Sequence, residues 1–569
     1  MLTNKIKISL NALYSDAHPV MVNPVGVTAL AGHLREVFPQ TVEVSVQCSL
    51  FDTLPQMIQR IRSQAPDIIG VSLQMGSHEQ MERFMSALEG IRGAFVKPPL
   101  IVLGNVLATF APEVLLERYP DALMVLGEGE SALEGLVRQV AGGGRAFAQV
   151  PNLIYRQDGR VIRTAREVFD LGRIAMPSFD FLHEMVRADG HVWTEASRGC
   201  NSHCTFCSRY PVRMADWAPI DVGHVLEKMT RMHRDYGVKH FRFTDDDFMG
   251  TGSPEGYSHA AAIAQGIISR RLKVTFDIST RVKAVFSLHD TEEANERKLE
   301  YFRLLRRAGL SQVYLGVESG SARQLKRFAK GVVVEENLKG VAAVLGLGLQ
   351  VVLGFITIDF LMDIDELEEN IAFLDKVGAF DPSKAVFVSD PLVTLRAQAG
   401  SAFVTMLDKQ GLLCDRNEFC LTYNGLYRDP RVGEVAALIE DWKKDFFSFS
   451  YVLKNRVSKL SMEKNNSRER VVLEGFLHEF KLLDYEYLVG ATRRVKQDHG
   501  TGLKAGRESL RAEHDALRLD IVSRLKKDLF WGNPDQYALL QFEIDKFMEA
   551  AAVKKQVPLE DGDLMAAAV

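Results

Sequence analysis

Three cysteines within eight residues carry the most specific chemistry in this sequence. Cys200, Cys204 and Cys207 stand in the segment CNSHCTFC, with the spacing C-x3-C-x2-C. Three thiolates in such a segment can hold three irons of a [4Fe–4S] cluster and leave the fourth iron open to another ligand. The alternative is a zinc site completed by His203 or by a distant residue. Zinc sites prefer paired CxxC or HxxxH units, however, and the sequence offers no second unit.

The cysteines directly follow the first strand of a repeated strand–helix pattern. Between about 191 and 390, apolar runs at 192–197, 240–245, 273–279, 312–319, 349–358 and 384–390 alternate with helical patterns near 222–236, 256–270, 296–308, 334–346 and 365–377. Six such units predict a partial TIM-type (β/α)6 barrel, whose active site lies at the carboxyl ends of the strands. The cysteines are therefore expected at that end.

The first 145 residues show the same alternation and predict a separate sheet. Strands are expected at 6–10, 42–46, 67–73, 99–104 and 122–127, with helices at 26–37, 54–64, 78–92, 112–118 and 130–140. The strands are rich in Val, Ile and Leu throughout, which is typical of a parallel sheet covered on both faces. We expect a flavodoxin-like, doubly wound α/β domain that binds a ligand beyond the carboxyl ends of its strands.

These patterns divide the chain into four predicted parts. Residues 1–145 form the doubly wound domain, and 146–190 form a linker with a hairpin whose turn is Asp158-Gly159. Residues 191–390 form the partial barrel. Residues 391–569 lack the alternation and are expected to be mostly helical and to cover the substrate.

Composition limits the partners and the compartment. The 69 Lys and Arg residues nearly balance the 74 Asp and Glu residues, so no basic field exists to hold nucleic acid. Six cysteines in 569 residues are too few for a disulfide framework, which favours a reducing compartment. The uncharged stretch Val341–Ile358 contains glycines and predicts a buried helix, a turn and a buried strand rather than a membrane span. We predict a cytoplasmic protein with no membrane contact.

The cysteine motif, with Phe206 before its last cysteine, resembles that of the radical S-adenosylmethionine (SAM) superfamily. The resemblance implies that SAM chelates the open iron and is cleaved to a 5′-deoxyadenosyl radical. It also implies an electron donor such as flavodoxin or ferredoxin.

Other pieces of the predicted barrel resemble SAM-binding segments of the same superfamily. They imply SAM contacts at the ends of the second, third and fourth strands. A helix N-terminus, a surface charge or a structural ion pair is the alternative at each place. Asp277 alternates with the third-strand residues and can face the same side of the sheet. The implied contacts are Asp245, Asp246, Ser279, Arg281, Glu318 and Ser319.

The first domain resembles the cobalamin-binding domain of one large group of radical SAM enzymes. The segments that carry this resemblance are DIIGVSLQMGS (67–77), LGN (103–105) and VLGEGESALEGLV (125–137). LGN departs from the family, in which two glycines are usual. The implied cobalamin contacts are Ser72, Gln74, Met75, Gly104, Asn105, Gly127, Glu128 and Gly129.

The lower face of the cobalt is expected to meet Gln74 or Met75. Asp16-Ala17-His18 is close to the D-x-H-x-x-G motif that supplies a histidine ligand, but Met21 replaces its glycine. The remaining cysteines, Cys48, Cys414 and Cys420, are expected to be buried and inert.

Together the resemblances imply a cobalamin-dependent radical SAM methyltransferase. Such an enzyme moves a methyl group from SAM, via methylcobalamin, to an unactivated carbon of a small-molecule or peptide substrate, as in natural product biosynthesis. One alternative keeps the [4Fe–4S] cluster, SAM and cobalamin but catalyses cyclisation or ring rearrangement. Another resembles the tryptophan C2-methyltransferase, a non-radical methylase, with Asp277 as the catalytic iron ligand. A cobalamin-binding sensor is a further alternative, which the intact cysteine triad disfavours.

Overall fold

The computed structural model describes residues 5–15, 21–188, 190–417, 421–444, 446–462, 468–497, 503–528 and 534–554. The chain divides into two compact units, Met1–Gly433 and Glu434–Val569. The first unit contains the cysteines and every other site residue predicted from the sequence. The predicted boundaries at 145, 190 and 390 stay a prediction.

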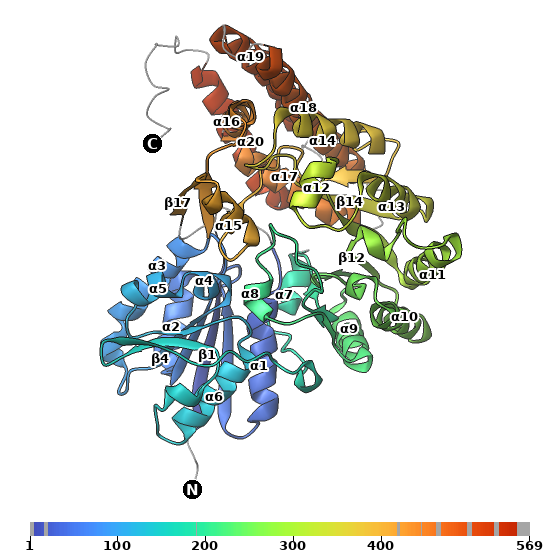
Figure 1. The fold of residues 1–569 in the computed structure, drawn as a ribbon. Coiled ribbons are helices and arrows are strands. Elements are labelled where there is room, and N and C mark those ends of the chain that lie inside the picture. The colour runs from blue at the N-terminus through green and yellow to red at the C-terminus, as the bar shows by residue number, and fades with distance from the viewer. Residues whose placement is uncertain are drawn as a thin grey trace. The chain divides into compact units, whose positions relative to one another are not determined.

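The first sheet of the Met1–Gly433 unit has seven strands in the order β2-β1-β3-β4-β5-β6-β7 (Figure 1). β1 to β5 are parallel, and the hairpin β6–β7 adds two antiparallel strands at the β5 edge. The predicted Asp158-Gly159 turn joins β6 to β7, so the hairpin belongs to the sheet. The elements are β1 (Ile6–Leu13), α1 (Val25–Val37), β2 (Val42–Cys48), α2 (Leu54–Gln64), β3 (Ile68–Leu73), α3 (His78–Gly90), β4 (Leu100–Gly104), α4 (Asn105–Phe110), α5 (Pro112–Arg118), β5 (Leu123–Val125), α6 (Glu130–Ala141), β6 (Leu153–Gln157) and β7 (Arg160–Arg163).

Two apolar layers hold this sheet, one on each face. Ile8 and Leu10 of β1 pack with Ala31 of α1 and Leu136 of α6, all buried. On the other face, β3 and β4 pack against α2, α3, α4 and α5 through residues such as Phe84. Burial on both faces explains why the strand sequences are apolar throughout.

The second sheet has six parallel strands in the order β15-β14-β13-β12-β11-β8, which is their order along the chain. One face packs on helices, as the buried Val313, Leu315 and Val351 show. The elements are α7 (Leu182–Arg187), β8 (Trp193–Thr194), β9 (Ser197–Arg198), α8 (Tyr210–Arg213), β10 (Ala218–Pro219), α9 (Val222–Tyr236), β11 (His240–Phe243), α10 (Pro254–Ser269), β12 (Thr275–Arg281), α11 (Glu292–Ala308), β13 (Leu310–Glu318), α12 (Ala322–Arg327), α13 (Val334–Gly346), β14 (Gln350–Phe355), α14 (Ile364–Val377) and β15 (Val386–Val388). The predicted α/β class with a partial barrel is confirmed.

The region after β15 differs in part from its predicted helical character. It contains a three-stranded antiparallel sheet in the order β16-β18-β17. These strands are short and half-exposed, so they lack the apolar runs by which the sequence reveals a buried strand. The elements are β16 (Ala397–Gln398), α15 (Ala402–Lys409), β17 (Leu413–Asn417) and β18 (Thr422–Gly425).

The Glu434–Val569 unit is helical, as predicted. Its helices pack around an aromatic core in which Trp442 stacks on Tyr487, with ring centroids 4.4 Å apart. The helices are α16 (Pro430–Lys444), which begins just before this unit, α17 (Phe447–Met462), α18 (Arg468–Gln497), α19 (Leu503–Asp528) and α20 (Pro534–Lys554).

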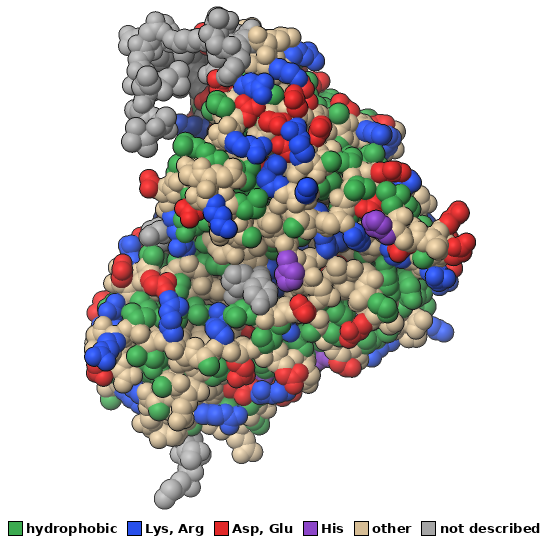
Figure 2. Space-filling view, in the orientation of Figure 1, with side chains coloured by type: hydrophobic (Ala, Val, Ile, Leu, Met, Phe, Trp, Pro, Cys, Tyr) green, Lys and Arg blue, Asp and Glu red, His purple; other side chains and the backbone are tan. Residues whose placement is uncertain are grey.

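The apolar stretch Val341–Ile358 forms the end of α13, a turn and β14, as predicted. Gly348 occupies the turn with φ +68°. Within the described residues, no helix is both long enough and apolar enough to span a bilayer. In the face drawn in Figure 2, acidic and basic side chains alternate without a field of one sign.

The prediction of buried, inert cysteines outside the motif is wrong for Cys414. Cys48 is buried, whereas Cys414 is exposed on the edge strand β17. The sequence did not reveal this strand, and its exposure could not be predicted. Cys420 and His18 lie outside the described residues.

Candidate active site

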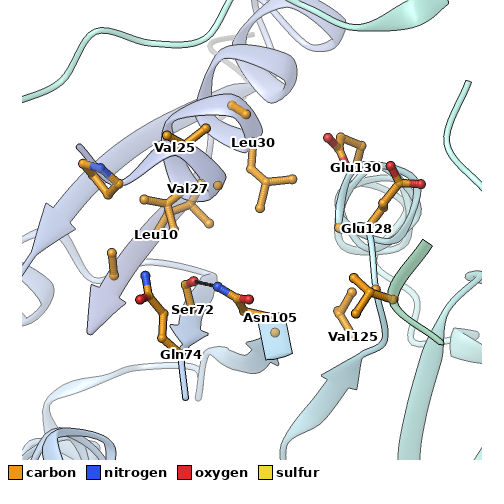
Figure 3. A pocket seen from close by; sticks show the side chains of 18 of the residues that line it. Leu10, Val25, Val27, Leu30, Ser72, Gln74, Asn105, Val125, Glu128 and Glu130 are labelled. Carbon is orange, nitrogen blue, oxygen red and sulfur yellow. Dashed lines mark hydrogen bonds between the residues drawn. The ribbon is translucent and has the colours of Figure 1, made fainter. Parts of the chain in front are cut away.

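A cavity of about 470 Å³ lies at the carboxyl edge of the first sheet and extends to the strands around the cysteines. Its floor is apolar and comes from β1 and α1, where Leu10, Val25, Val27 and Leu30 line it (Figure 3). From the second sheet and its loops it is lined by Trp193, Glu195, Arg198, Arg209, Arg213 and Asp246. The cavity therefore extends from the predicted cobalamin site to the segments on either side of the cysteine loop, although none of the three cysteines lines it.

Polar side chains lie at the carboxyl ends of β3 and β4, beside the cavity. The amide of Asn105 donates to Ser72 Oγ at 2.9 Å. Asn105 has φ +75°, a conformation that favours glycine but that asparagine tolerates. An asparagine can therefore stand at a backbone position that glycine would also adopt.

The side chains of Gln74 and Met75, the two residues predicted below the cobalt, have different surroundings. Gln74 lines the cavity and is hydrogen-bonded to Tyr14, whose pKa burial raises. Met75 does not belong to the lining and packs instead against the apolar layer of α2 and α3. Of the two, the structure brings only Gln74 to the cavity.

The loop between β5 and α6 contains Gly127, Glu128 and Gly129, and all three line the cavity. Gly127 has φ +72°, and a Cβ there would lie 2.1 Å from the Val212 carbonyl oxygen. Only glycine allows this close approach to α8.

A buried group of charges, here called the Arg198 cluster, joins this loop to the barrel. Arg198 Nη1 donates to Glu128 Oε1 at 3.0 Å and to Glu130 Oε1 at 2.9 Å. The same guanidinium forms a bidentate pair with Glu195 at 2.9 Å. Burial disfavours ionised Glu195, but the charge of Arg198 and its hydrogen bonds lower the pKa of Glu195 to about 2. The members are Glu128, Glu130, Glu195, Arg198, Arg213 and Lys228.

The cysteine loop begins directly after β9. Cys200, Cys204 and Cys207 are all partly accessible, and the Cys207 amide donates to the Cys204 carbonyl at 3.0 Å. Burial raises the pKa of the Cys200 and Cys207 thiols. Across the described residues, no three His, Cys, Asp or Glu side chains converge tightly enough to enclose a single metal ion. A cluster does not require such convergence, because each thiolate binds a different iron.

Arg281, at the end of β12, contacts the cysteine loop directly. Its guanidinium donates to Ser202 Oγ and, at 2.5 Å, to the Lys330 carbonyl. Glu318 ends β13 with φ +66° and pairs with Lys330 Nζ at 3.2 Å. The predicted ends of the third and fourth strands therefore meet around the loop.

Of the three aspartates after β11, two form buried structural hydrogen bonds and one lines the cavity. Asp245 is buried and accepts from Ser197 Oγ at 2.5 Å, and burial raises its pKa to about 7. Asp246 lines the cavity, where it pairs with Arg209, and burial raises its pKa to about 6. Asp247 accepts from Thr280 Oγ1 at 2.8 Å and orders the turn.

Asp277 does not join the cysteines. Its carboxylate accepts from Arg242 Nε at 2.7 Å and from His240 Nε2 at 3.1 Å. It precedes Arg281 by four residues, or roughly 13 Å of extended strand. This geometry corresponds to a structural ion pair on the face of the sheet away from the helices.

Three other predicted contacts have these surroundings. Ser279 is half-buried, and its carbonyl accepts from the Phe248 amide at 2.9 Å. Ser319 is fully buried, and its hydroxyl donates to Asn370 Oδ1 at 2.9 Å. Phe206 packs edge-on against Phe328 and supports the cysteine loop.

Sequence reasoning missed several cavity residues, including Tyr14, Trp193, Arg209 and Arg213. Each lies just outside a recognised motif. Trp193 Nε1 and Arg213 Nε are buried without a hydrogen-bond partner among the described residues. Their positions next to the cysteine loop or at a strand end are the only signals that could have identified them.

The residues present fit the expected groups. An apolar floor, a rim of amides and hydroxyls, and two orphaned N–H donors suit a large flat ligand with amide arms, such as cobalamin. Three accessible thiolates in one loop suit an iron–sulfur cluster, because soft sulfur ligands favour such clusters.

Family comparisons agree with both halves of the site. Residues 194–374 match the model of the radical SAM superfamily, and residues 14–137 match that of the B12 binding domain. The chain belongs to the cobalamin-dependent radical SAM family. Its cofactors are therefore a [4Fe–4S] cluster, SAM and cobalamin.

Individual members of the family resemble the chain to different extents. It is 31% identical over 360 residues to the 4′-phospho-dehydrooxetanocin synthase of Priestia megaterium. That match covers 62% of this chain and 48% of the relative, so the chain spans about half of the relative's length. An uncharacterized methyltransferase of Pyrococcus horikoshii is 26% identical over 363 residues, which are 62% of this chain and 73% of that protein.

The fold agrees with a solved member of the family. The structure of the cobalamin-dependent S-adenosylmethionine radical enzyme OxsB with aqua-cobalamin bound superposes with a TM-score of 0.82. The superposition covers 96% of this chain and 84% of that chain at 22% identity, which establishes a shared fold.

Proposed function

We propose that this cobalamin-dependent radical SAM enzyme transfers a methyl group from SAM, by way of cobalamin, to an unactivated carbon of a small-molecule or peptide substrate. The observation that carries the proposal is the cavity shared by the β5–α6 loop and the strands around the cysteines. The cavity reaches the segments that flank the cysteine loop, so a substrate at its barrel end would lie between the two cofactors.

The residues of the chain have separable roles in this proposal. Cys200, Cys204 and Cys207 hold three irons, and Ser72 and Asn105 present polar groups at the rim of the cobalamin site. When bound, the cluster with SAM supplies a radical that removes a hydrogen atom, and cobalamin supplies a methyl group. The apolar floor gives part of the cavity a lining that does not bind water, which limits contact between water and reactive species. The electron donor is proposed to be a flavodoxin or a ferredoxin.

Ring rearrangement without methyl transfer is the second candidate, because a 31% identical relative is a synthase named for dehydrooxetanocin formation. The non-radical alternative needs a carboxylate at the open iron. Asp277 was its candidate, but its carboxylate is held by Arg242 and His240, so we do not propose that mechanism.

The fate of the SAM methyl group distinguishes methyl transfer from ring rearrangement. The reconstituted protein, a reductant and SAM with a deuterated methyl group would be incubated with a small-molecule extract, with and without cobalamin. Methyl transfer predicts a deuterium-labelled product together with S-adenosylhomocysteine and 5′-deoxyadenosine. An unlabelled product formed with 5′-deoxyadenosine alone would contradict methyl transfer and favour rearrangement.

A further inference from the structure

The cysteine loop is held at both ends by arginines that meet the same carboxylate. Arg198 directly precedes the loop and Arg213 ends α8 just after it. Glu128 Oε1 accepts from Arg198 Nη1 at 3.0 Å and from Arg213 Nη1 at 2.5 Å. One side chain of the β5–α6 loop therefore connects to both ends of the segment that holds the cluster.

Glu128 is itself held in a single position. Its second oxygen, Oε2, accepts from the Phe169 amide at 3.1 Å. The neighbouring Gly127 approaches the Val212 carbonyl so closely that a Cβ would lie 2.1 Å from it. The β5–α6 loop and α8 thus contact each other through backbone as well as through charge.

Burial makes this connection stiff. The side chains of Arg213 and Glu128 are 6% and 9% exposed, and that of Arg198 is 15% exposed. Glu128, Glu130 and Glu195 face Arg198, Arg213 and Lys228, so the buried charges balance. Separating such a pair leaves an uncompensated buried charge, which is strongly unfavourable.

The same loop is also a wall of the cobalamin cavity, since Gly127, Glu128, Gly129 and Glu130 all line it. We propose that Glu128 is a positioning residue that couples the cobalamin site to the cluster loop through Arg198 and Arg213. A shift of the β5–α6 loop that favours one cofactor is transmitted through these buried pairs to the other site, so binding of the first cofactor changes the affinity for the second. Coupling of this kind is reciprocal between the two ligands. The proposal needs the two cofactors and does not depend on methyl transfer.

The test compares cobalamin affinity with and without the cluster. Equilibrium dialysis of the full chain against hydroxocobalamin, read by cobalt analysis, gives a Kd for cluster-free and for reconstituted protein, both without SAM. In the wild type the reconstituted form is expected to bind about tenfold more tightly, within the usual range of coupling between sites. The coupling ratio is the Kd of the cluster-free protein divided by the Kd of the reconstituted protein. In Glu128→Gln this ratio is expected to approach one.

A matched control comes from the same helix region. Glu134 in α6 is also a buried carboxylate, paired with His33 at 2.7 Å and with Arg173 at 2.5 Å. It has no contact with either arginine of the cysteine loop in the described ion pairs. Glu134→Gln is therefore expected to keep the wild-type ratio even if it weakens cobalamin binding in both forms.

A second variant guards against failure of the first to fold. Arg213→Gln leaves Glu128 paired with Arg198 and is expected to reduce the ratio part of the way. A wild-type ratio of one would overturn the proposal. A wild-type ratio in Glu128→Gln would also overturn it, and if that variant does not fold, a wild-type ratio in Arg213→Gln would do the same. A loss of the ratio in Glu134→Gln equal to that in Glu128→Gln would overturn it as well.

Discussion

At the scale of single residues, the cysteines depend on their metal for their charge. Burial raises the pKa of the Cys200 and Cys207 thiols, whereas iron binds the thiolate. Metal binding must therefore release protons, and the loop holds its cluster only when all the ligands are present.

Replacing one cysteine tests the ligand set. Cys204→Ala is expected to reduce iron from about four atoms per chain to nearly none after anaerobic reconstitution, because two thiolates hold a cluster poorly. Cys414→Ala, at an exposed cysteine outside the loop, should retain the full iron content. Full iron in Cys204→Ala would contradict the assignment.

Asp245 gives the protein a specific pH dependence. Burial raises its pKa to about 7 from an ordinary value of 3.8, so folding favours the protonated form. Its contribution to stability is therefore greatest below about pH 4 and falls as the pH rises towards 7, by about 1.4 kcal/mol for each pKa unit.

Asp245→Asn removes this titration while retaining an acceptor for Ser197. Urea midpoints of the cofactor-free protein at pH 5 and pH 7.5 should fall less with pH in the variant than in the wild type. Asp235→Asn, at an exposed aspartate paired with Arg234, serves as the control. The same pH dependence in all three proteins would refute the role of Asp245.

At the scale of elements, the strand and helix pattern was readable because β1 to β5 and the whole second sheet are parallel and covered by helices. Buried strands such as β3 and amphipathic helices such as α9 differ clearly in period, and the ranges predicted for these two agree closely with the observed ones. The strand predicted at 192–197 instead forms the two-residue strand β8 of the sheet and the separate strand β9. The strands β16 to β18 were missed because they are short, half-exposed and polar.

The sequence could predict the candidate site only where the spacing of glycines or cysteines formed a specific motif. The period of a strand places Asp277 on the right face but cannot show that Arg242 and His240 hold its carboxylate. The sequence could not separate Gln74 from Met75 for a related reason, because the alternation of a strand no longer fixes the side chains one and two residues after its end. The Arg198 cluster was missed because its members come from segments far apart in the sequence.

The β5–α6 loop offers a test at this scale. Gly127→Ala would place a Cβ 2.1 Å from the Val212 carbonyl, whereas Gly143 has a similar φ of +69° and nothing within 4 Å. Both variants share the strain of a positive φ, which is about 1 kcal/mol or more. Only Gly127→Ala is expected to lose cobalamin binding by more than tenfold, measured by dialysis and cobalt analysis. Equal losses in the two variants would mean that contact with α8 is unimportant.

At the scale of the whole molecule, the Met1–Gly433 unit brings two cofactor domains to one cavity. The B12 binding domain supplies most of the floor and the β5–α6 loop, and the radical SAM domain supplies Arg198, Arg209 and Arg213, which flank the cysteine loop. Under the proposed function, a substrate between the two domains would be reached from either side.

The most direct test of this account is a metal count on the full chain after anaerobic reconstitution with iron, sulfide and hydroxocobalamin. The account predicts about four irons and one cobalt per chain, with the cobalt lost in Gly127→Ala while the iron remains. Four irons without cobalt in the wild type would contradict the assignment of the cavity to cobalamin.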